Sequence, residues 1–152
     1  MSVAREQDFF GWAQEQSTLL RRASEFRLNT PPDLDWEHLA EEIRLLGVSL
    51  ERELRSRYAV LLLHLLKWQY QPGLKGSSWR KTIREQRKQI AEILEESPSL
   101  RARRAAEMAR AYSDARDDAE DETGLPLKVF PKMCPFSLDQ VEDRDFWPEP
   151  DA

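Results

Sequence analysis

Apolar residues recur every three or four positions over a long stretch in the middle of the chain. The steps between them are 3, 4, 3, 4, 4, 4, 3, 4 and 3, and the residues are Trp36, Leu39, Ile43, Leu46, Leu50, Leu54, Tyr58, Leu61, Leu65 and Trp68. This spacing matches the 3.6-residue period of an α-helix that packs on one side. Residues 59–66 are apolar all round except for His64. We therefore expect residues 58–70 to form a central helix surrounded by the others.

The length of this stretch is itself informative. One straight helix would measure roughly 50 Å at 1.5 Å per residue. A compact domain of this chain length has a radius of gyration of only about 15 Å. We therefore expect a bend or break near residues 47–49, where Gly47 weakens a helix and Ser49 is a suitable cap.

The remaining helices are marked by caps and breakers. Asp8 is predicted to cap a helix that runs to Phe26 and is followed by Pro31 and Pro32, and Asp35 caps the central stretch. Serine and proline at Ser97-Pro98 separate two further helices, over residues 79–96 and 98–122.

These last two helices each begin with basic residues and end with acidic ones, an order that opposes the helix dipole. An antiparallel hairpin would place the basic start of one helix beside the acidic end of the other. We therefore predict that hairpin and read the charges as pairing within the chain.

The chain changes character after Gly124. Five of the nine prolines lie beyond it, interleaved with large apolar residues. We expect residues 125–148 to form an ordered, irregular strap over the helices, with a short helix capped by Ser137 and Gln140. The predicted fold is an all-α helical bundle in a single domain, residues 1–152, with its core over residues 8–124.

Composition and charge exclude several classes of protein. With 23 basic and 28 acidic residues the net charge is −5, which gives no general attraction to nucleic acid or to an anionic membrane. Cys134 is the single cysteine, so neither an internal disulfide nor a cysteine-based metal site is expected. No apolar run approaches the roughly 20 residues of a membrane span, and the first residues lack a signal-peptide core. We expect a cytoplasmic location.

The sequence contains no recognisable catalytic motif. It has no Gly-x-Ser-x-Gly elbow, no Walker-type phosphate loop and no Gly-x-Gly-x-x-Gly. His38 shares a helix face with Glu41 and Glu42, which resembles half of a carboxylate-bridged metal site, but no second helix supplies a matching set. We expect no metal and no cofactor, and we favour a protein that is not an enzyme.

One group of polar and aromatic residues nevertheless invites two interpretations. These residues are predicted to gather around the central helix, and they are His64, Lys67, Trp68, Tyr70, Trp79, Arg87, Glu41 and Glu42. Polar groups beside an apolar helix need partners, so a buried paired network is the interpretation that we favour. The same groups around a cleft would form a small-ligand or anion site, or an enzymatic one.

Two surfaces suggest binding to a macromolecule. Phe146 and Trp147 in the strap are candidate anchors for a protein partner, which is our leading hypothesis for function. The basic residues 80–88 suggest nucleic-acid binding or antitoxin-like regulation, an alternative that the hairpin explanation of the charges makes weaker. The oligomeric state is left open.

Four segments together resemble a known family, the domain-of-unknown-function family twenty-nine. They are Asp35-Trp-Glu-His-Leu-Ala-Glu-Glu-Ile43, His64-Leu-Leu-Lys-Trp-Gln-Tyr-Gln-Pro72, Ser78-Trp-Arg-Lys-Thr-Ile-Arg-Glu-Gln-Arg87 and Asp145-Phe-Trp-Pro148. The resemblance extends from Asp8 to Pro148. It implies a helical bundle in a bacterial cytoplasm and no established activity, cofactor or catalytic residue. His38 departs from the family pattern, in which Asn is expected, and this further weakens a metal site there.

Overall fold

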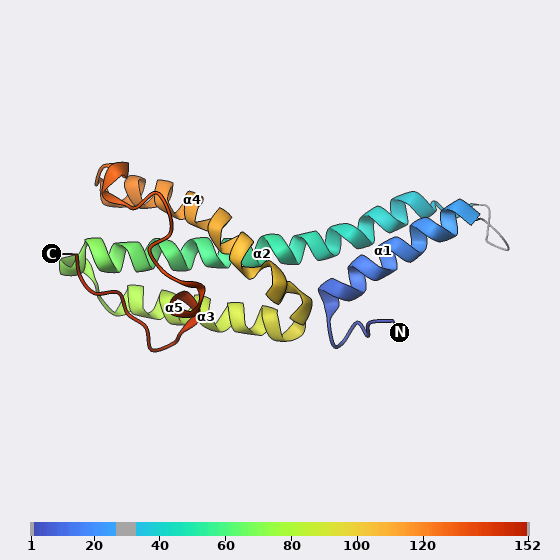
Figure 1. The fold of residues 1–152 in the computed structure, drawn as a ribbon, viewed down its shortest axis with the longest axis horizontal. Coiled ribbons are helices and arrows are strands. Elements are labelled where there is room, and N and C mark those ends of the chain that lie inside the picture. Colours follow the sequence, from blue (N-terminus) through green and yellow to red (C-terminus); the bar gives the residue numbers. More distant parts are fainter. Residues whose placement is uncertain (1, 27–32, 152) are drawn as a thin grey trace. The chain divides into compact units, whose positions relative to one another are not determined.

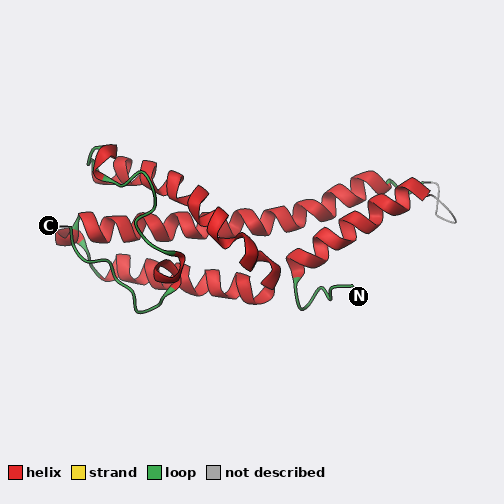
Figure 2. Ribbon diagram, in the orientation of Figure 1, coloured by secondary structure: helices red, strands yellow, loops and turns green. Residues whose placement is uncertain are grey.

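The computed structural model describes residues 2–26 and 33–151, and every regular element in this part of the chain is helical (Figure 2). The elements are α1 (Phe9–Phe26), α2 (Trp36–Tyr70), η1 (Pro72–Leu74), α3 (Ser77–Glu96), η2 (Pro98–Arg103), α4 (Arg104–Thr123), η3 (Leu127–Val129) and α5 (Leu138–Glu142). The all-α prediction is confirmed.

The chain forms two compact units. Unit 1 comprises Met1–Arg52 with Leu94–Arg101, and unit 2 comprises Glu53–Ile93 with Ala102–Ala152. Unit 1 therefore contains α1 and the first half of α2, and unit 2 contains the second half of α2, most of α3, and α4 with the strap (Figure 1). The extent of a single domain stays a prediction.

Helix α1 begins where the sequence predicts. Asp8 caps it, because its Oδ1 accepts hydrogen bonds from the Gly11 amide at 3.2 Å and from Ser99 Oγ at 2.8 Å. Buried Ser97 accepts a hydrogen bond from the Phe10 amide at 3.1 Å, so this serine ties the α3–α4 connection to α1. Pro31 and Pro32, expected to follow the helix, lie outside the described residues.

The predicted break near residues 47–49 is wrong, because α2 is helical without interruption from Trp36 to Tyr70. Gly47 is instead a place of close approach. A Cβ at this position would lie 3.4 Å from the Ala13 Cβ and 3.4 Å from the Phe10 ring. Helix α2 is too long for a single core because it belongs to two units. Residues 36–52 are part of unit 1, and residues 53–70 are part of unit 2.

The second half of α2 is the central helix of unit 2, as predicted. Val60 is 36% exposed, but the side chains with 7% exposure or less are Leu54, Tyr58, Leu61, Leu62, Leu63, Leu65, Leu66 and Trp68. Ile83 and Ile90 of α3 are buried as well, and three of the six buried residues of α4 are alanines, Ala111, Ala115 and Ala119. Small residues let a helix backbone approach its neighbour closely.

The two helices of the predicted hairpin follow each other in opposite directions (Figure 1). Their junction differs from expectation, because Pro98 opens the 3₁₀ helix η2 and α4 starts only at Arg104. Gly124 ends α4 in the left-handed conformation, with φ at 72°. Some ion pairs of α4 reach other elements, since Glu122 pairs with Lys67 and Arg104 with Glu142.

The strap is ordered by side chains that donate to its backbone. Arg116 donates to the carbonyls of Phe130 and Leu127, both at 3.1 Å. Phe130, Phe136 and Val141 are buried. The short helix α5 starts as predicted, with both halves of the Ser137–Gln140 capping box formed. This segment, irregular in sequence, is therefore part of the core of unit 2.

Candidate functional site

His64, on the central helix, is half-buried and bonded to its own backbone. Its Nδ1 lies 2.8 Å from the Val60 carbonyl oxygen, one turn earlier. Burial lowers the pKa of His64 below its usual value, and the nearby Lys67 ammonium lowers it further. These surroundings favour the neutral imidazole.

The Lys67 ammonium has two partners, a carboxylate and an aromatic ring. Its ammonium is 3.3 Å from Glu122 of α4 and 4.7 Å from the centre of the Trp79 ring of α3. The structure thus joins Lys67 and Trp79, as the sequence suggests, but the acidic partner is Glu122, which sequence reasoning did not select. Lys67 is therefore paired with groups of α3 and α4.

The candidate aromatic residues pack among themselves. The rings of Trp68 and Trp147 are 4.6 Å apart, and Tyr70 meets Phe130 edge-on at 5.2 Å. Phe146 lies 6.0 Å from Phe136. Phe146 and Trp147, proposed from sequence as partner anchors, are therefore half-buried within unit 2 rather than fully projecting.

The remaining candidates belong to unit 1. Glu41 pairs with Arg21 at 3.0 Å and with Arg44 at 2.7 Å, and Glu42 is exposed. Exposed His38 binds the Asp35 carboxylate, and this bond raises the pKa of His38. Asp35 also caps α2 as predicted, accepting from the His38 amide. His38 is thus committed to its cap rather than to Glu41 or Glu42.

Arg87 is the most unusual of the predicted residues, because its charged side chain is almost completely buried. The residue is 6% exposed. Its guanidinium donates to the carbonyls of Val141 at 2.9 Å, Gln140 at 3.3 Å and Arg144 at 3.5 Å. Burial lowers the pKa of Arg87, an effect that the carboxylates of Asp143 and Asp145 oppose.

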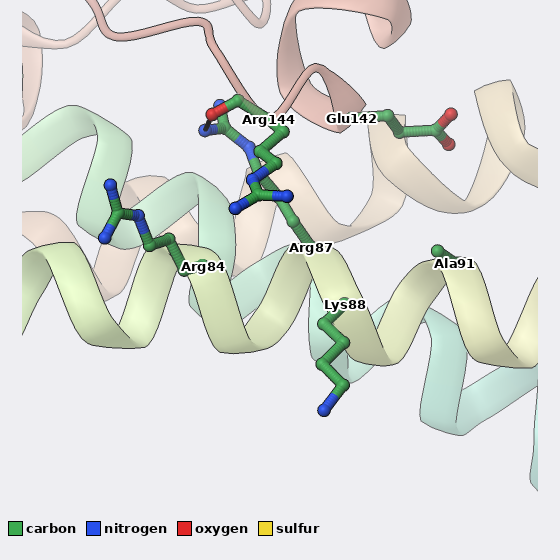
Figure 3. A pocket seen from close by; sticks show the side chains of 6 residues that line it. All are labelled: Arg84, Arg87, Lys88, Ala91, Glu142 and Arg144. Atoms are coloured by element: carbon green, nitrogen blue, oxygen red, sulfur yellow. Dashed lines mark hydrogen bonds between the residues drawn. The ribbon is translucent and has the colours of Figure 1, made fainter.

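A hollow of about 430 Å³ opens beside this arginine (Figure 3). It is lined by Arg84, Arg87, Lys88, Ala91, Glu142 and Arg144. Four of these six side chains are basic. Figure 3 shows Arg144 reaching toward α3 from the strap, whereas the Glu142 carboxylate points away from the guanidinium groups.

The acidic residue of the hollow does not neutralise it. Glu142 accepts a hydrogen bond from the Tyr58 hydroxyl at 2.5 Å and pairs with Arg104 at 2.8 Å. Both of its oxygens are thereby engaged by groups outside the hollow. The lining consequently keeps a positive charge, which the nearby carboxylates of Asp143 and Asp145 partly offset, and the chemistry that it suits is the binding of carboxylate or phosphate groups.

A second, shallower hollow continues along the same helix. It is lined by Ser77, Arg80, Lys81, Arg84, Glu85 and Lys88, and it shares Arg84 and Lys88 with the first. The two hollows define one surface, which we call the α3 basic face: Arg80, Lys81, Arg84, Arg87 and Lys88 of α3 together with Arg144 of the strap.

The α3 basic face borders the tryptophan pair. The Arg80 guanidinium lies 5.9 Å from the Trp68 ring centre and 6.0 Å from that of Trp147, and Arg87 lies 5.6 Å from Trp147. The sequence marks the basic residues of α3 as a run of charge. Arg144 carries no such signal, because it stands between two aspartates in a polar segment and only folding brings it to α3.

No three His, Cys, Asp or Glu side chains in residues 2–26 and 33–151 come together to hold a metal ion. Across the same residues no helix is long and apolar enough to cross a membrane. Cys134 donates to the Phe136 carbonyl at 3.4 Å, and burial raises the pKa of its thiol, which opposes a role as a nucleophile.

Comparisons with known proteins agree with this fold. A family model described as domain of unknown function DUF29 matches residues 5–147. The chain is similar to a crystal structure of an alpha-helical protein of unknown function from Rhodospirillum rubrum ATCC 11170, with a TM-score of 0.76 and 27% identity. The match covers 96% of this chain and 93% of that one. No curated protein matches the chain.

Proposed function

Because this chain belongs to the family of the domain of unknown function DUF29, whose description names no activity, we propose a function from the α3 basic face. The protein is a macromolecule-binding domain that binds an acidic segment of another protein on this face. The observation that carries the proposal is the hollow at Arg84, Arg87, Lys88 and Arg144, where the single carboxylate is already engaged elsewhere.

The positive charge of this face stands out against the charge of the whole chain. The net charge is −5, so a basic surface on this protein is local. Arg87 strengthens it, because a charged residue that is only 6% exposed is poorly screened by water and salt. A carboxylate entering the hollow would meet Arg84, Lys88 and Arg144 at the rim and Arg87 below them.

The size of the face favours a peptide over a nucleic acid. From Arg80 to Lys88 the helix rises roughly 12 Å at 1.5 Å per residue. That length offers contacts to only two or three phosphates, whereas proteins that depend on the phosphate backbone neutralise about six to ten. The acidic remainder of the chain also repels a long polyanion.

The neighbouring tryptophans supply an apolar edge to the same surface. Trp147 is half-buried on Trp68, and its ring lies against Arg80 and Arg87. Exposed parts of such a ring suit an apolar side chain in the partner, as in many interface anchors. The expected partner segment therefore carries several carboxylates beside a large apolar residue.

The test uses fluorescence anisotropy with a labelled oligoglutamate peptide of about ten residues that contains one phenylalanine, at about 150 mM salt. We expect saturable binding that Arg84→Glu/Lys88→Glu weakens tenfold or more, equivalent to about 1.4 kcal/mol. The control is Lys128→Glu/Lys132→Glu, which makes the same charge change at exposed strap lysines and should bind like the wild type.

Three results would count against the proposal. Equal weakening by both double variants would mean that only net charge matters. Tighter binding of an oligodeoxythymidine of equal charge, lost steeply as salt rises, would assign the face to nucleic acid. Saturable binding of inorganic phosphate alone, with no further gain from the peptide, would indicate a small-anion site.

A further inference from the structure

The helical hairpin of unit 1 has two unlike sides. Small residues predominate along its seam: Ala13, Ser17, Ala40 and Gly47 are buried, and Gly47 approaches Ala13 and the ring of Phe10. Small residues bring two helix backbones close together and push the larger side chains to the flanks of the contact. The character of each flank then decides what else the hairpin can bind.

One flank of the hairpin carries charged side chains that pair with one another. Arg21 of α1 pairs with Glu41 of α2 at 3.0 Å, and Glu41 also pairs with Arg44 at 2.7 Å. Each residue turns about 100° along a helix, and measured from the seam these residues fall on one side. Their exposed side chains, with 39–50% of their area accessible, are stable in water without further cover.

The opposite flank is apolar and open. Antiparallel helices turn in opposite senses when seen from one end, so the same 100° steps place two stripes side by side there. We call this surface the unit 1 apolar face: Trp12, Leu19, Leu20 and Ala23 of α1, and Leu39, Ile43, Leu46 and Leu50 of α2. Leu19, Leu39 and Leu46 are 44%, 41% and 52% exposed.

The second half of α1 contributes no buried side chain to the hairpin. All the buried residues of α1 lie in its first half, Phe10, Ala13 and Ser17. From Thr18 onward α1 therefore rests on α2 without a buried side chain of its own. Single exposed leucines are ordinary, but a row of them along two adjacent helices marks an interface.

We propose that this face binds the same face of a second copy of the chain, giving a four-helix arrangement around a two-fold axis. Two-helix hairpins commonly complete their core in this way, with the helices nearly antiparallel. The face suits a second copy of itself, because none of its eight residues is charged and two such faces can meet without burying an ion. A two-fold axis needs only one such surface per chain.

The area of the face agrees with a weak to moderate dimer. The hairpin offers roughly 27 Å of helix length and about 20 Å of width, given a helix diameter near 10 Å. Two copies would therefore bury about 1,000 Å² in total, which is near the lower limit for a specific interface. This inference concerns unit 1 alone and does not depend on the function proposed for the α3 basic face.

The test is the mass of the protein in solution, measured by sedimentation velocity over chain concentrations of about 1–100 µM. We expect the wild type to approach twice the chain mass of 17.8 kDa at the upper end of this range. Leu46→Glu places a carboxylate in the apolar contact and should raise the dimer dissociation constant tenfold or more.

The neighbouring leucine provides a matched control. Leu45 is 37% exposed but lies on the other side of α2, so Leu45→Glu should dimerise like the wild type. Far-ultraviolet circular dichroism of both variants verifies that the helices are intact. A wild-type monomer throughout the range overturns the proposal, and so does a dimer that Leu46→Glu leaves unchanged. Sedimentation of a monomeric wild type with phosphatidylcholine vesicles, lost in Leu46→Glu, would assign the face to lipid instead.

Discussion

The two units of this chain use the same long helix in different ways. In unit 1, residues 36–52 of α2 meet α1 along small residues and leave leucines in water. In unit 2, residues 53–70 bury most of their apolar side chains, and Val60 at 36% exposure is the exception. Unit 2 encloses its own hydrophobic core, whereas unit 1 buries only the residues between its two helices. Stability should therefore depend mainly on unit 2, and self-association on unit 1.

The largest expected effect is a cavity in the core of unit 2. Leu62 is completely buried, so Leu62→Ala should lower the free energy of unfolding by about 2–5 kcal/mol. The same change at Leu45 of unit 1, which is 37% exposed, should cost less than about 1 kcal/mol. Guanidinium denaturation measures both, and similar values for the two variants would refute the contrast.

A somewhat smaller loss is expected where α3 holds the strap. Arg87→Ala leaves the carbonyls of Val141 and Gln140 without their donor, at a cost of about 1–3 kcal/mol. Hydrogen exchange should show faster exchange in residues 137–147 than in α1. Arg84→Ala, one turn earlier and exposed, is the control and should stay within about 0.5 kcal/mol of wild type.

The close packing of α1 on α2 in unit 1 can be tested by introducing a larger side chain at Gly47. Gly47→Leu would push a side chain against Ala13 and Phe10, and overpacking of this kind costs about 1–3 kcal/mol. The loss should appear as faster amide exchange in α1, with unit 2 protected as before. Gly73→Leu is the comparison, because a Cβ at Gly73 meets nothing within 4 Å. Equal damage to both units would contradict a separate seam.

The smallest expected effect concerns the two histidines, which should titrate in opposite directions from 6.5. The Asp35 carboxylate raises the pKa of His38 in unit 1, and burial lowers that of His64 in unit 2. Nuclear magnetic resonance titration of the ring protons would resolve them, with His64→Gln to assign the signals. A His64 that titrates above His38 would contradict the burial of the His64 ring.

The same shift has a consequence for stability. Below pH 6.5 the unfolded chain takes up a proton at His64 before the folded chain does, so stability falls as the pH drops through this window. The dependence should diminish in His64→Gln. For His38 the sign is opposite, since its contribution is complete below pH 6.5 and is lost as the pH rises through its folded pKa.

Local signals predicted most of the elements. The Asp8 and Asp35 caps, the left-handed Gly124 and the Ser137–Gln140 capping box form as the sequence indicates. Each of these features depends on residues within four positions of one another. The Gly47 prediction failed because it used chain length and helix propensity, whereas the role of that glycine depends on α1.

The candidate site was predictable only in part. The sequence identifies Arg87 and the basic run of α3, and it marks Lys67 and Trp79 as neighbours. It does not identify Glu122, Glu142 or Arg144 as their partners, because those residues lie tens of positions away in the chain. A contact at that distance depends on how helices pack, and a helical period does not record it.

The sequence by itself thus determined where helices run and which face of each is apolar, because both follow from spacing of three or four residues. Only the tertiary structure decided that one helix serves two units and that a basic hollow forms beside buried Arg87. It also decided which flank of the unit 1 hairpin remains open. The physical reason is that burial and charge pairing depend on neighbours from other elements, which the local pattern does not specify.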